Sequence, residues 1–186
     1  MENLAHLAAA ARSNQPGAFA ALVTALQPGI FQITGRFARN HHDFGDLSQE
    51  ICLRLWKSLP ALRDTIAFPA WFRSLAVRTC YDWLRRRRSR QDHEVSREQL
   101  ADTPDLPDEP PGEEDAVNPA AERVYTALAQ LKPAARLVLT LLELEEHTIE
   151  EVAALTGWSS GNVRVRAHRA RAALRRALSA PAEPAG

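Results

Sequence analysis

Arginine side chains crowd the C-terminal part of this sequence, in a run that could bind the phosphates of a nucleic acid. Six arginines and no acidic residue fall between Arg164 and Leu178. A merely solvated helix would normally mix acids and bases on its exposed side, so this bias favours a phosphate-binding surface. A second basic run, Arg85–Arg90, ends a helical pattern that also exposes Arg78 and Tyr81. A basic helix interleaved with aromatic residues can hold phosphates and stack unpaired bases.

No catalytic or metal-binding pattern stands out. The sequence contains no glycine-rich phosphate loop, no Gly-x-Ser-x-Gly and no His-Glu-x-x-His. His168 has no orienting partner, and His41-His42-Asp43 lacks a second ligand pair at helical spacing. Cys52 and Cys80 also lack metal-ligand spacing, so we expect small buried thiols and leave a disulfide open. We therefore expect a protein that is not an enzyme and uses no cofactor or metal.

The arginine-rich segment follows the pattern of a helix-turn-helix. Thr148 and Glu151 have the spacing of a capping box, which predicts that a helix begins between them. Gly157 suits the left-handed residue that ends such a helix, and Ser159 or Ser160 can cap the next one. In DNA-binding proteins with this unit, the second helix lies in the major groove.

A helical wheel divides the second helix into a buried and an exposed side. At 100° per residue the buried stripe consists of Val163, Ala167, Ala170 and Leu174. Val165, His168 and Arg169 fall opposite that stripe. Arg164, Arg171 and Arg175 lie along one flank and Arg166 lies along the other, so arginines stand on both sides of the exposed face.

Charge is distributed unevenly over 186 residues whose formal net charge is zero. Residues 1–90 carry thirteen basic and six acidic side chains, a net charge of +7. Residues 91–122 carry one and eleven (−10), and residues 123–186 carry nine and six (+3). Since charges act over roughly 10 Å at physiological salt, the local sign matters more than the total. The acidic, proline-rich segment 91–118 is expected to be a flexible or extended linker.

Every convincing element is helical. Before the linker, we expect a weak alanine-rich helix over residues 1–15 and a helical pattern over 16–37 that Pro28-Gly29 breaks or kinks. A loop at 41–43, a helix over Asp46–Leu59, a loop over Arg63–Phe68 and a helix from Pro69 to about Arg88 follow. After the linker, we expect helices over 119–131 and 133–145 and then the helix-turn-helix. On the helix Asp46–Leu59, Leu47, Ile51 and Leu55 form the apolar stripe, and Arg54 belongs to a polar side interpreted as solvated.

The predicted fold class is all-α, with two small helical domains joined by the acidic linker. The domains span residues 1–90 and 119–178, and a disordered tail is expected over 179–186. No segment approaches the roughly 20 apolar residues that a membrane span needs, and no signal sequence is visible. The expected location is therefore the cytoplasm, without membrane insertion.

Three segments, in this order, resemble a bacterial sigma factor of the extracytoplasmic-function (group 4) type, in the sigma-70 family. DLSQEICLRLWKSL resembles the helix that binds the RNA polymerase clamp. AWFRSLAVRTCYDWLRRRRSR resembles the helix that reads and melts the −10 promoter element. Residues 127–174 resemble the domain that reads the −35 element, with a helix-turn-helix at its end. The resemblance covers residues 16–90 and 120–178, and three segments in the right order are strongly specific.

The resemblance implies a promoter-specificity subunit and a role for each matching residue. Contacts to the β′ clamp helices are implied for Asp46, Gln49 and Glu50. The −10 element would be bound by the loop Arg63, Asp64, Thr65, Ile66, Ala67 and Phe68, which captures a flipped base, and by Trp71, Arg78, Tyr81 and Arg85. The −35 element would be bound by Ser160, Asn162, Arg164, Val165, His168, Arg169 and Arg171. The implied partners are core RNA polymerase (β′ clamp helices and β flap), promoter DNA and an anti-sigma factor.

Two other functions stay open from the residues alone. The first is a stand-alone helix-turn-helix regulator that binds duplex DNA without polymerase, and the second is a sigma-like adaptor held in protein complexes. Arg78 stands where the family often has asparagine, so the base preference at −10 does not transfer. The regulon, the inducing signal and the identity of an anti-sigma partner are not readable from the sequence.

Overall fold

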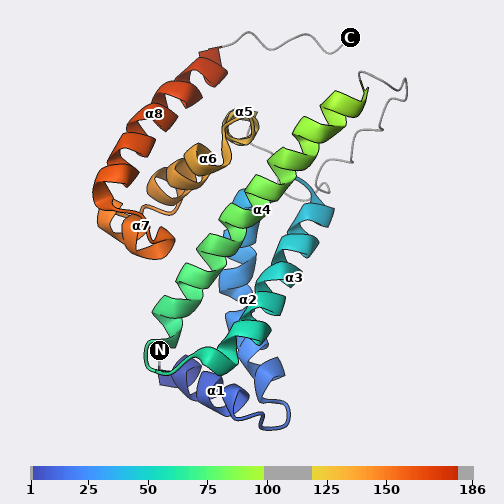
Figure 1. Cartoon of the computed structure of the whole chain (residues 1–186), viewed down its shortest axis with the longest axis vertical. Coiled ribbons are helices and arrows are strands. Elements are labelled where there is room, and N and C mark those ends of the chain that lie inside the picture. The colour runs from blue at the N-terminus through green and yellow to red at the C-terminus, as the bar shows by residue number, and fades with distance from the viewer. Residues whose placement is uncertain (1, 99–118, 180–186) are drawn as a thin grey trace. The chain divides into compact units, whose positions relative to one another are not determined.

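The computed structural model describes residues 2–98 and 119–179, and its helices form two compact units (Figure 1). The first unit contains the described residues up to Arg86, and the second contains residues 87–98, which are the last turns of α4, together with those from Pro119 onward. No strand occurs in these described ranges, so the all-α fold class is confirmed. Most of the predicted linker and nearly all of the predicted tail lie outside the described residues.

The first unit is a bundle around the stripe predicted for residues 46–59. Its elements are α1 (Glu2–Arg12), α2 (Ala18–Phe37), α3 (His41–Ser58), a 3-10 turn η1 (Leu59–Ala61) and α4, which begins at Phe68 and ends at Glu98. Leu47, Ile51 and Leu55 are fully buried on α3. α2 packs against α1 and α3. Burying these side chains contributes about 1.5–3 kcal/mol each.

Of the two expectations at Pro28-Gly29, a break or a kink, the break is wrong, because α2 continues through both residues. Pro28 lies on the exposed side, while Leu26 and Ile30 are buried on the other. Packing of that apolar face therefore holds the helix together despite the amide hydrogen that proline lacks.

The same helix also contradicts the expectation that no segment could span a membrane. By length and composition alone, α2 is apolar enough to do so. Its buried residues Leu22, Leu26, Ile30 and Phe37 recur on one face, which is the pattern of a core helix in a helical bundle. The contacts of α2 with α1 and α3 account for that face.

The predicted loop at residues 41–43 is wrong, because α3 already begins at His41. Asn40 caps the helix, and its side-chain oxygen accepts a hydrogen bond from the Asp43 backbone at 2.7 Å. The Asp43 carboxylate reaches back to the backbone N–H of Arg39 at 3.2 Å. This reciprocal capping starts the helix about one turn before the apolar stripe that was used to predict it.

The C-terminal end of α4 also differs from the prediction. The helix continues to Glu98, past the predicted end near Arg88 and into the expected linker.

From Pro119 to Ser179, the described residues of the second unit form four helices and one widened turn. Its elements are α5 (Pro119–Ala129), α6 (Pro133–Leu139), a π-helical turn η2 (Thr140–Leu144), α7 (Ile149–Thr156) and α8 (Ser160–Ser179). Leu128, Leu131, Leu139 and Ala170 form a buried cluster that joins α5, α6 and α8. The π-helical turn replaces the regular helix expected up to Glu145. Glu145 caps it, and the next residue, Glu146, has a φ of 55°. α8 thus rests on the other three helices of the unit.

Candidate nucleic-acid interface

The turn between α7 and α8 has the predicted geometry. The hydroxyl of Thr148 accepts a hydrogen bond from the Glu151 backbone at 3.2 Å, and the Glu151 carboxylate accepts one from the Thr148 backbone at 2.7 Å. These bonds, the backbone one first, hold the pKa of Glu151 below its ordinary value. Gly157 ends α7 with a φ of 79°, a conformation that glycine adopts without strain. Ser159 caps α8 by accepting a hydrogen bond from the Asn162 backbone at 3.2 Å.

The exposed face of α8 carries three of the residues predicted to read DNA. The predicted buried stripe is confirmed, since Val163, Ala167 and Ala170 are buried and Leu174 packs against the core. Opposite it, Val165 is 50% exposed, and His168 and Arg169 are exposed. Within the described part of the chain, these three side chains have no recorded hydrogen bond or ion pair. They are therefore available to a partner.

The flank that carries Arg164 and Arg171 differs from that face, because both arginines already form ion pairs within the unit. Arg164 pairs with Glu150 of α7 at 3.1 Å, and Arg171 pairs with Glu143 of η2 at 2.7 Å. All four side chains are about half exposed or more, so these are surface pairs that contribute little to stability. Carboxylates therefore occupy the guanidinium groups that the sequence assigned to DNA.

Trp158, in the turn between α7 and α8, also has a structural role. The guanidinium of Arg166 lies 4.5 Å from the ring centre of Trp158, and its Nε donates a hydrogen bond to the side chain of Asn162. A cation over an indole ring is attracted by the ring quadrupole. Asn162, one of the predicted DNA-binding residues, thus bonds to its own helix. Ser160 is half-buried at the start of α8.

The loop before α4 is ordered and has one residue in the core. Phe68 is fully buried, with its ring 5.9 Å from those of Trp71 and Phe72. Its side chain is thus not available to the flipped base that the predicted loop would capture. Ile66, by contrast, is 82% exposed, and its backbone N–H donates to the Asp64 carboxylate at 2.8 Å. Arg63, Asp64 and Ala67 are exposed, and Thr65 is half-buried.

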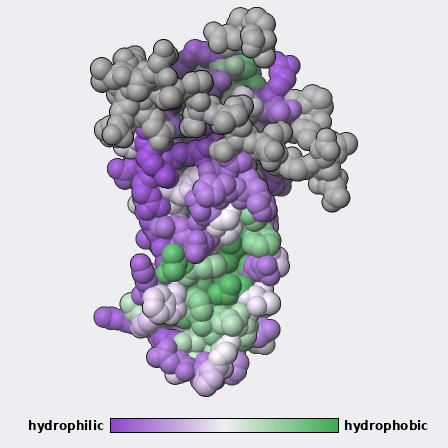
Figure 2. Space-filling model, turned by 90° about the vertical axis from the view of Figure 1, so that its right-hand side faces the viewer, coloured by the Kyte–Doolittle hydropathy of each residue, from purple (hydrophilic) through white to green (hydrophobic). Residues whose placement is uncertain are grey.

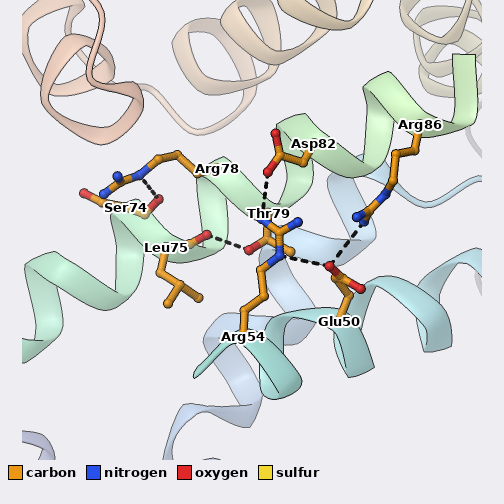
Figure 3. A network of polar contacts seen from close by, with 8 residues as sticks. All are labelled: Glu50, Arg54, Ser74, Leu75, Arg78, Thr79, Asp82 and Arg86. Carbon is orange, nitrogen blue, oxygen red and sulfur yellow. Dashed lines mark hydrogen bonds and ion pairs between the residues drawn. The ribbon is translucent and has the colours of Figure 1, made fainter. Parts of the chain in front are cut away.

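The exposed side of α4 carries the other residues predicted for the −10 element. Arg78 is exposed, and its Nε donates to the Ser74 carbonyl at 3.1 Å (Figure 3). Arg85 lies 5.8 Å from the ring centre of the half-buried Tyr81. Trp71 is half-buried near the start of the helix. The predicted residues therefore follow one helix from its first turn to the basic run.

An ion-pair network joins α3 to α4 and includes a residue predicted to bind polymerase. Arg54 donates to Glu50 at 2.9 Å and to Asp82 at 2.7 Å, and Arg86 approaches the same Glu50 oxygen at 3.3 Å (Figure 3). The solvated role predicted for Arg54 is therefore wrong. Burial works to raise the pKa of Glu50, but the bonds and charges of Arg54 and Arg86 outweigh it and lower that pKa. Glu50 stays ionised, and only its Oε1 is used in these pairs.

A mixed polar and apolar strip runs beside that network on α3. Asp46 and Gln49 are exposed, and Leu53 and Trp56, at 45% and 60% exposed, follow them at helical spacing. Sequence reasoning missed the last two, although a tryptophan outside the i, i+4 stripe was a usable signal. Figure 2 shows apolar surface gathered over one face of the first unit. Isolated apolar residues are normal on surfaces, but adjacent large ones mark contact sites.

The cysteines and acidic groups offer no alternative site. Cys80 is buried and Cys52 is half-buried, both as free thiols, and burial raises the pKa of Cys52. Among the residues in the described ranges, no three His, Cys, Asp or Glu side chains gather in a group that could hold a metal.

Comparison with known families gives two matches, one in each unit. Residues 22–90 match the family model of Sigma-70 region 2, and residues 121–174 match that of Sigma-70, region 4. α1 and its turn lie before the first match.

Individual relatives agree with these matches. The chain is 32% identical to a probable RNA polymerase sigma factor, RfaY, of Xanthomonas campestris pv. campestris, over 87% of this chain and 40% of that protein. It is 30% identical to the RNA polymerase sigma-E factor of Streptomyces coelicolor, over 87% of this chain and 86% of that protein. Among solved structures, that of CnrH in complex with the cytosolic domain of CnrY has a TM-score of 0.60 and 25% identity, over 95% of this chain and 97% of that one. The chain spans about half the length of two of its curated relatives, 40% and 56%.

Proposed function

The chain belongs to the sigma-70 family, in its extracytoplasmic-function group, and we propose that it is a sigma factor that directs RNA polymerase to specific promoters. In this role it acts in the cytoplasm as a non-catalytic subunit, and core polymerase performs the chemistry. The observation that carries the proposal is the pair of family matches, one on each unit. The exposed face of α8 supports it, since its side chains Val165, His168 and Arg169 make no polar contact with the residues that the structure describes.

The −35 element is assigned to α8. Val165, His168 and Arg169 are exposed and have no polar contact to another described residue, so they are placed to contact base edges in a major groove. Arg164 and Arg171 flank them and can exchange their carboxylates for phosphates. Ser160 and Asn162 lie at the start of the same helix, where backbone N–H groups favour a phosphate.

The −10 element is assigned to the loop over residues 63–67 and to the exposed side of α4. The loop presents Ile66 at its tip. Arg78, Tyr81 and Arg85 then offer cations and an aromatic ring along the helix, a combination that suits a separated strand. Phe68 ends the loop with its ring buried next to that of Trp71.

The polymerase clamp is assigned to the strip on α3. Asp46 and Gln49 supply polar contacts, and Leu53 and Trp56 add apolar area. Exposed tryptophans are frequent anchors of protein interfaces. Glu50 lies at the edge of this strip, and its Oε2 remains available while Arg54 and Arg86 bond Oε1. The β flap is assigned to the second unit by the family resemblance alone.

An anti-sigma factor is proposed as a further partner. The similar protein CnrH has been solved in complex with a cytosolic domain of CnrY. A protein that covers the strip on α3 or the exposed face of α8 would block binding to polymerase or to the −35 element.

Run-off transcription with core polymerase and a genomic promoter library tests the proposal. The purified chain should bind core and yield discrete transcripts that core alone does not produce. Absence of core binding at micromolar concentration would contradict it. A gel shift on the same promoters without polymerase should give weak binding, whereas tight specific binding would favour a stand-alone regulator.

A charge variant tests the clamp strip. Gln49→Lys places a cation on the exposed strip without touching the ion-pair network, and it should weaken core binding about tenfold or more. Gln27→Lys, on the exposed side of α2, is the matched control and should bind core normally. Normal core affinity of Gln49→Lys would remove this face from the assignment.

A further inference from the structure

The first helix contacts the loop that is assigned to the −10 element. Nη1 of Arg12, the last residue of α1, donates to the carbonyl of Leu62 at 2.8 Å and to that of Arg63 at 3.1 Å. The contact joins residues 50 and 51 positions apart in the chain. α1 lies before the segment that matches Sigma-70 region 2, so neither the family match nor the sequence pattern assigned it a role.

The end of α1 that carries Arg12 is fixed to the bundle. Ala8 and Ala11 are buried, and α1 packs against both α2 and η1. Small side chains at these positions let the helix approach η1 closely. The guanidinium is thus held by a packed helix rather than by a mobile tail, and its own atoms remain exposed. Because the guanidinium is exposed and bonds only two backbone carbonyls, we infer that Arg12 does not contribute to the hydrophobic core.

The loop is restrained at three points, of which Arg12 supplies the first. Downstream of the two carbonyls, the Asp64 carboxylate accepts a hydrogen bond from the Ile66 backbone at 2.8 Å. The Phe68 backbone then donates to the Thr65 carbonyl at 3.2 Å, and the Phe68 ring is buried. Between these points the chain turns outward and leaves Ile66 as the exposed tip.

We propose that Arg12 is a positioning residue for −10 recognition, because it fixes the backbone from which the loop tip projects. The inference rests on the proposed function, since the loop must contact a promoter base for its position to matter. When Arg12 is removed, the carbonyls of Leu62 and Arg63 lose their common anchor, and the backbone over residues 63–66 samples more conformations. A loop that is less pre-organised discriminates less between bases, because each base must now order it on binding.

Two variants and a control test this role in the full chain bound to core polymerase. Arg12→Ala removes both hydrogen bonds, Arg12→Lys keeps a donor of the same charge, and Arg39→Ala removes an exposed arginine whose recorded contact uses only its backbone. Open-complex formation is measured on four versions of a promoter found in the run-off assay, which differ at one −10 base. Affinity for core and for duplex −35 DNA is measured in parallel.

Arg12→Ala should reduce the ratio between the preferred and the poorest base about three- to tenfold, the range expected for one or two exposed hydrogen bonds. Arg12→Lys should restore part of that ratio, and Arg39→Ala should match the wild type. Affinity for core and for −35 DNA should not change. In the free protein, Arg12→Ala should also speed amide hydrogen exchange at residues 63–66 relative to Arg39→Ala.

The outcomes separate this inference from the proposed function. If the wild type forms no open complex on any promoter, the proposed function fails, and the exchange experiment alone then decides whether Arg12 holds the loop. If the wild type discriminates and Arg12→Ala keeps the same base ratio, the positioning role is wrong, whatever happens to the thermal stability. An equal loss of activity on all four bases would likewise reduce Arg12 to a purely structural residue.

Discussion

Charged residues are used in opposite ways at the junction of α3 with α4 and on α8. At the junction, Arg54 bonds to two carboxylates on different helices and so holds the helices together. On α8, the flanking arginines pair with surface acids, while Arg169 on the exposed face has no recorded contact in the described part of the chain. The difference lies in burial, because Arg54 and Glu50 are only 30% exposed, whereas the side chains of the α8 pairs are 48–66% exposed. An arginine-rich sequence pattern therefore does not by itself distinguish an ion-pair network between helices from a surface that binds DNA.

Arg169→Ala should produce the largest loss, and it should affect recognition rather than folding. We expect a loss of about 1–3 kcal/mol in discrimination among −35 sequences if Arg169 contacts a base. Stability should change by less than about 0.5 kcal/mol, because the side chain is exposed. Competition binding of the holoenzyme to promoters with altered −35 bases measures the first quantity, and denaturant unfolding measures the second.

Arg54→Met should give the reverse pattern. Loss of its two bonds should lower the free energy of unfolding of the first unit by about 1–2 kcal/mol, because Asp82 and Glu50 lose a partly buried partner. Binding to −35 DNA should stay normal. Hydrogen exchange assigns the loss to α3 and α4, and a double-mutant cycle with Asp82→Asn should give a coupling of about 1 kcal/mol. A coupling of zero would make the junction equivalent to a surface pair.

Arg171→Ala tests the proposal that this arginine exchanges Glu143 for a phosphate when DNA binds. A phosphate contact predicts weaker binding that is nearly uniform across sequences, and a slope of log K against log salt that falls by about one. Arg123→Ala is a control that removes an exposed arginine from α5 of the same unit. An unchanged salt slope would mean that Arg171 keeps its bond to Glu143 when DNA is bound.

The smallest expected effect is the pH dependence of the junction. The folded-state pKa of Glu50 lies below its ordinary value, so its contribution to stability is full above about pH 4.5 and is lost as the pH falls through the folded pKa. The stability difference between wild type and Glu50→Gln should therefore shrink as the pH falls below about 4.5. We expect a change of at most about 1 kcal/mol, since water screens the partly exposed pair. Urea unfolding at several pH values measures it.

The parts of the fold that could be predicted from the sequence are those set by residues close together in the chain. The capping box at Thr148, the left-handed Gly157 and the buried stripe from Val163 depend on residues close together in the chain, and all three predictions are confirmed. The start of α3 was missed because Asn40 and Asp43 cap it before the apolar stripe begins. That Asn-x-x-Asp spacing was a usable signal.

The remaining errors come from contacts between distant parts of the chain. Arg54 and Asp82 are 28 positions apart, and Arg12 and Leu62 are 50 apart, so no local pattern links them. Pro28 stays inside α2 because tertiary packing outweighs its local preference. The residues assigned to polymerase and promoter contacts stay predictions, which the experiments above decide.

The carboxylates of Glu150 and Glu143 have a consequence for the search through a genome. They occupy the guanidinium groups of Arg164 and Arg171 in the free chain. Any stretch of duplex must displace them before it gains those phosphate contacts, and random DNA offers the exposed face of α8 no matching bases in return. We therefore expect the free chain to be held only weakly by the vast excess of irrelevant sequence, so that most copies remain free to meet polymerase.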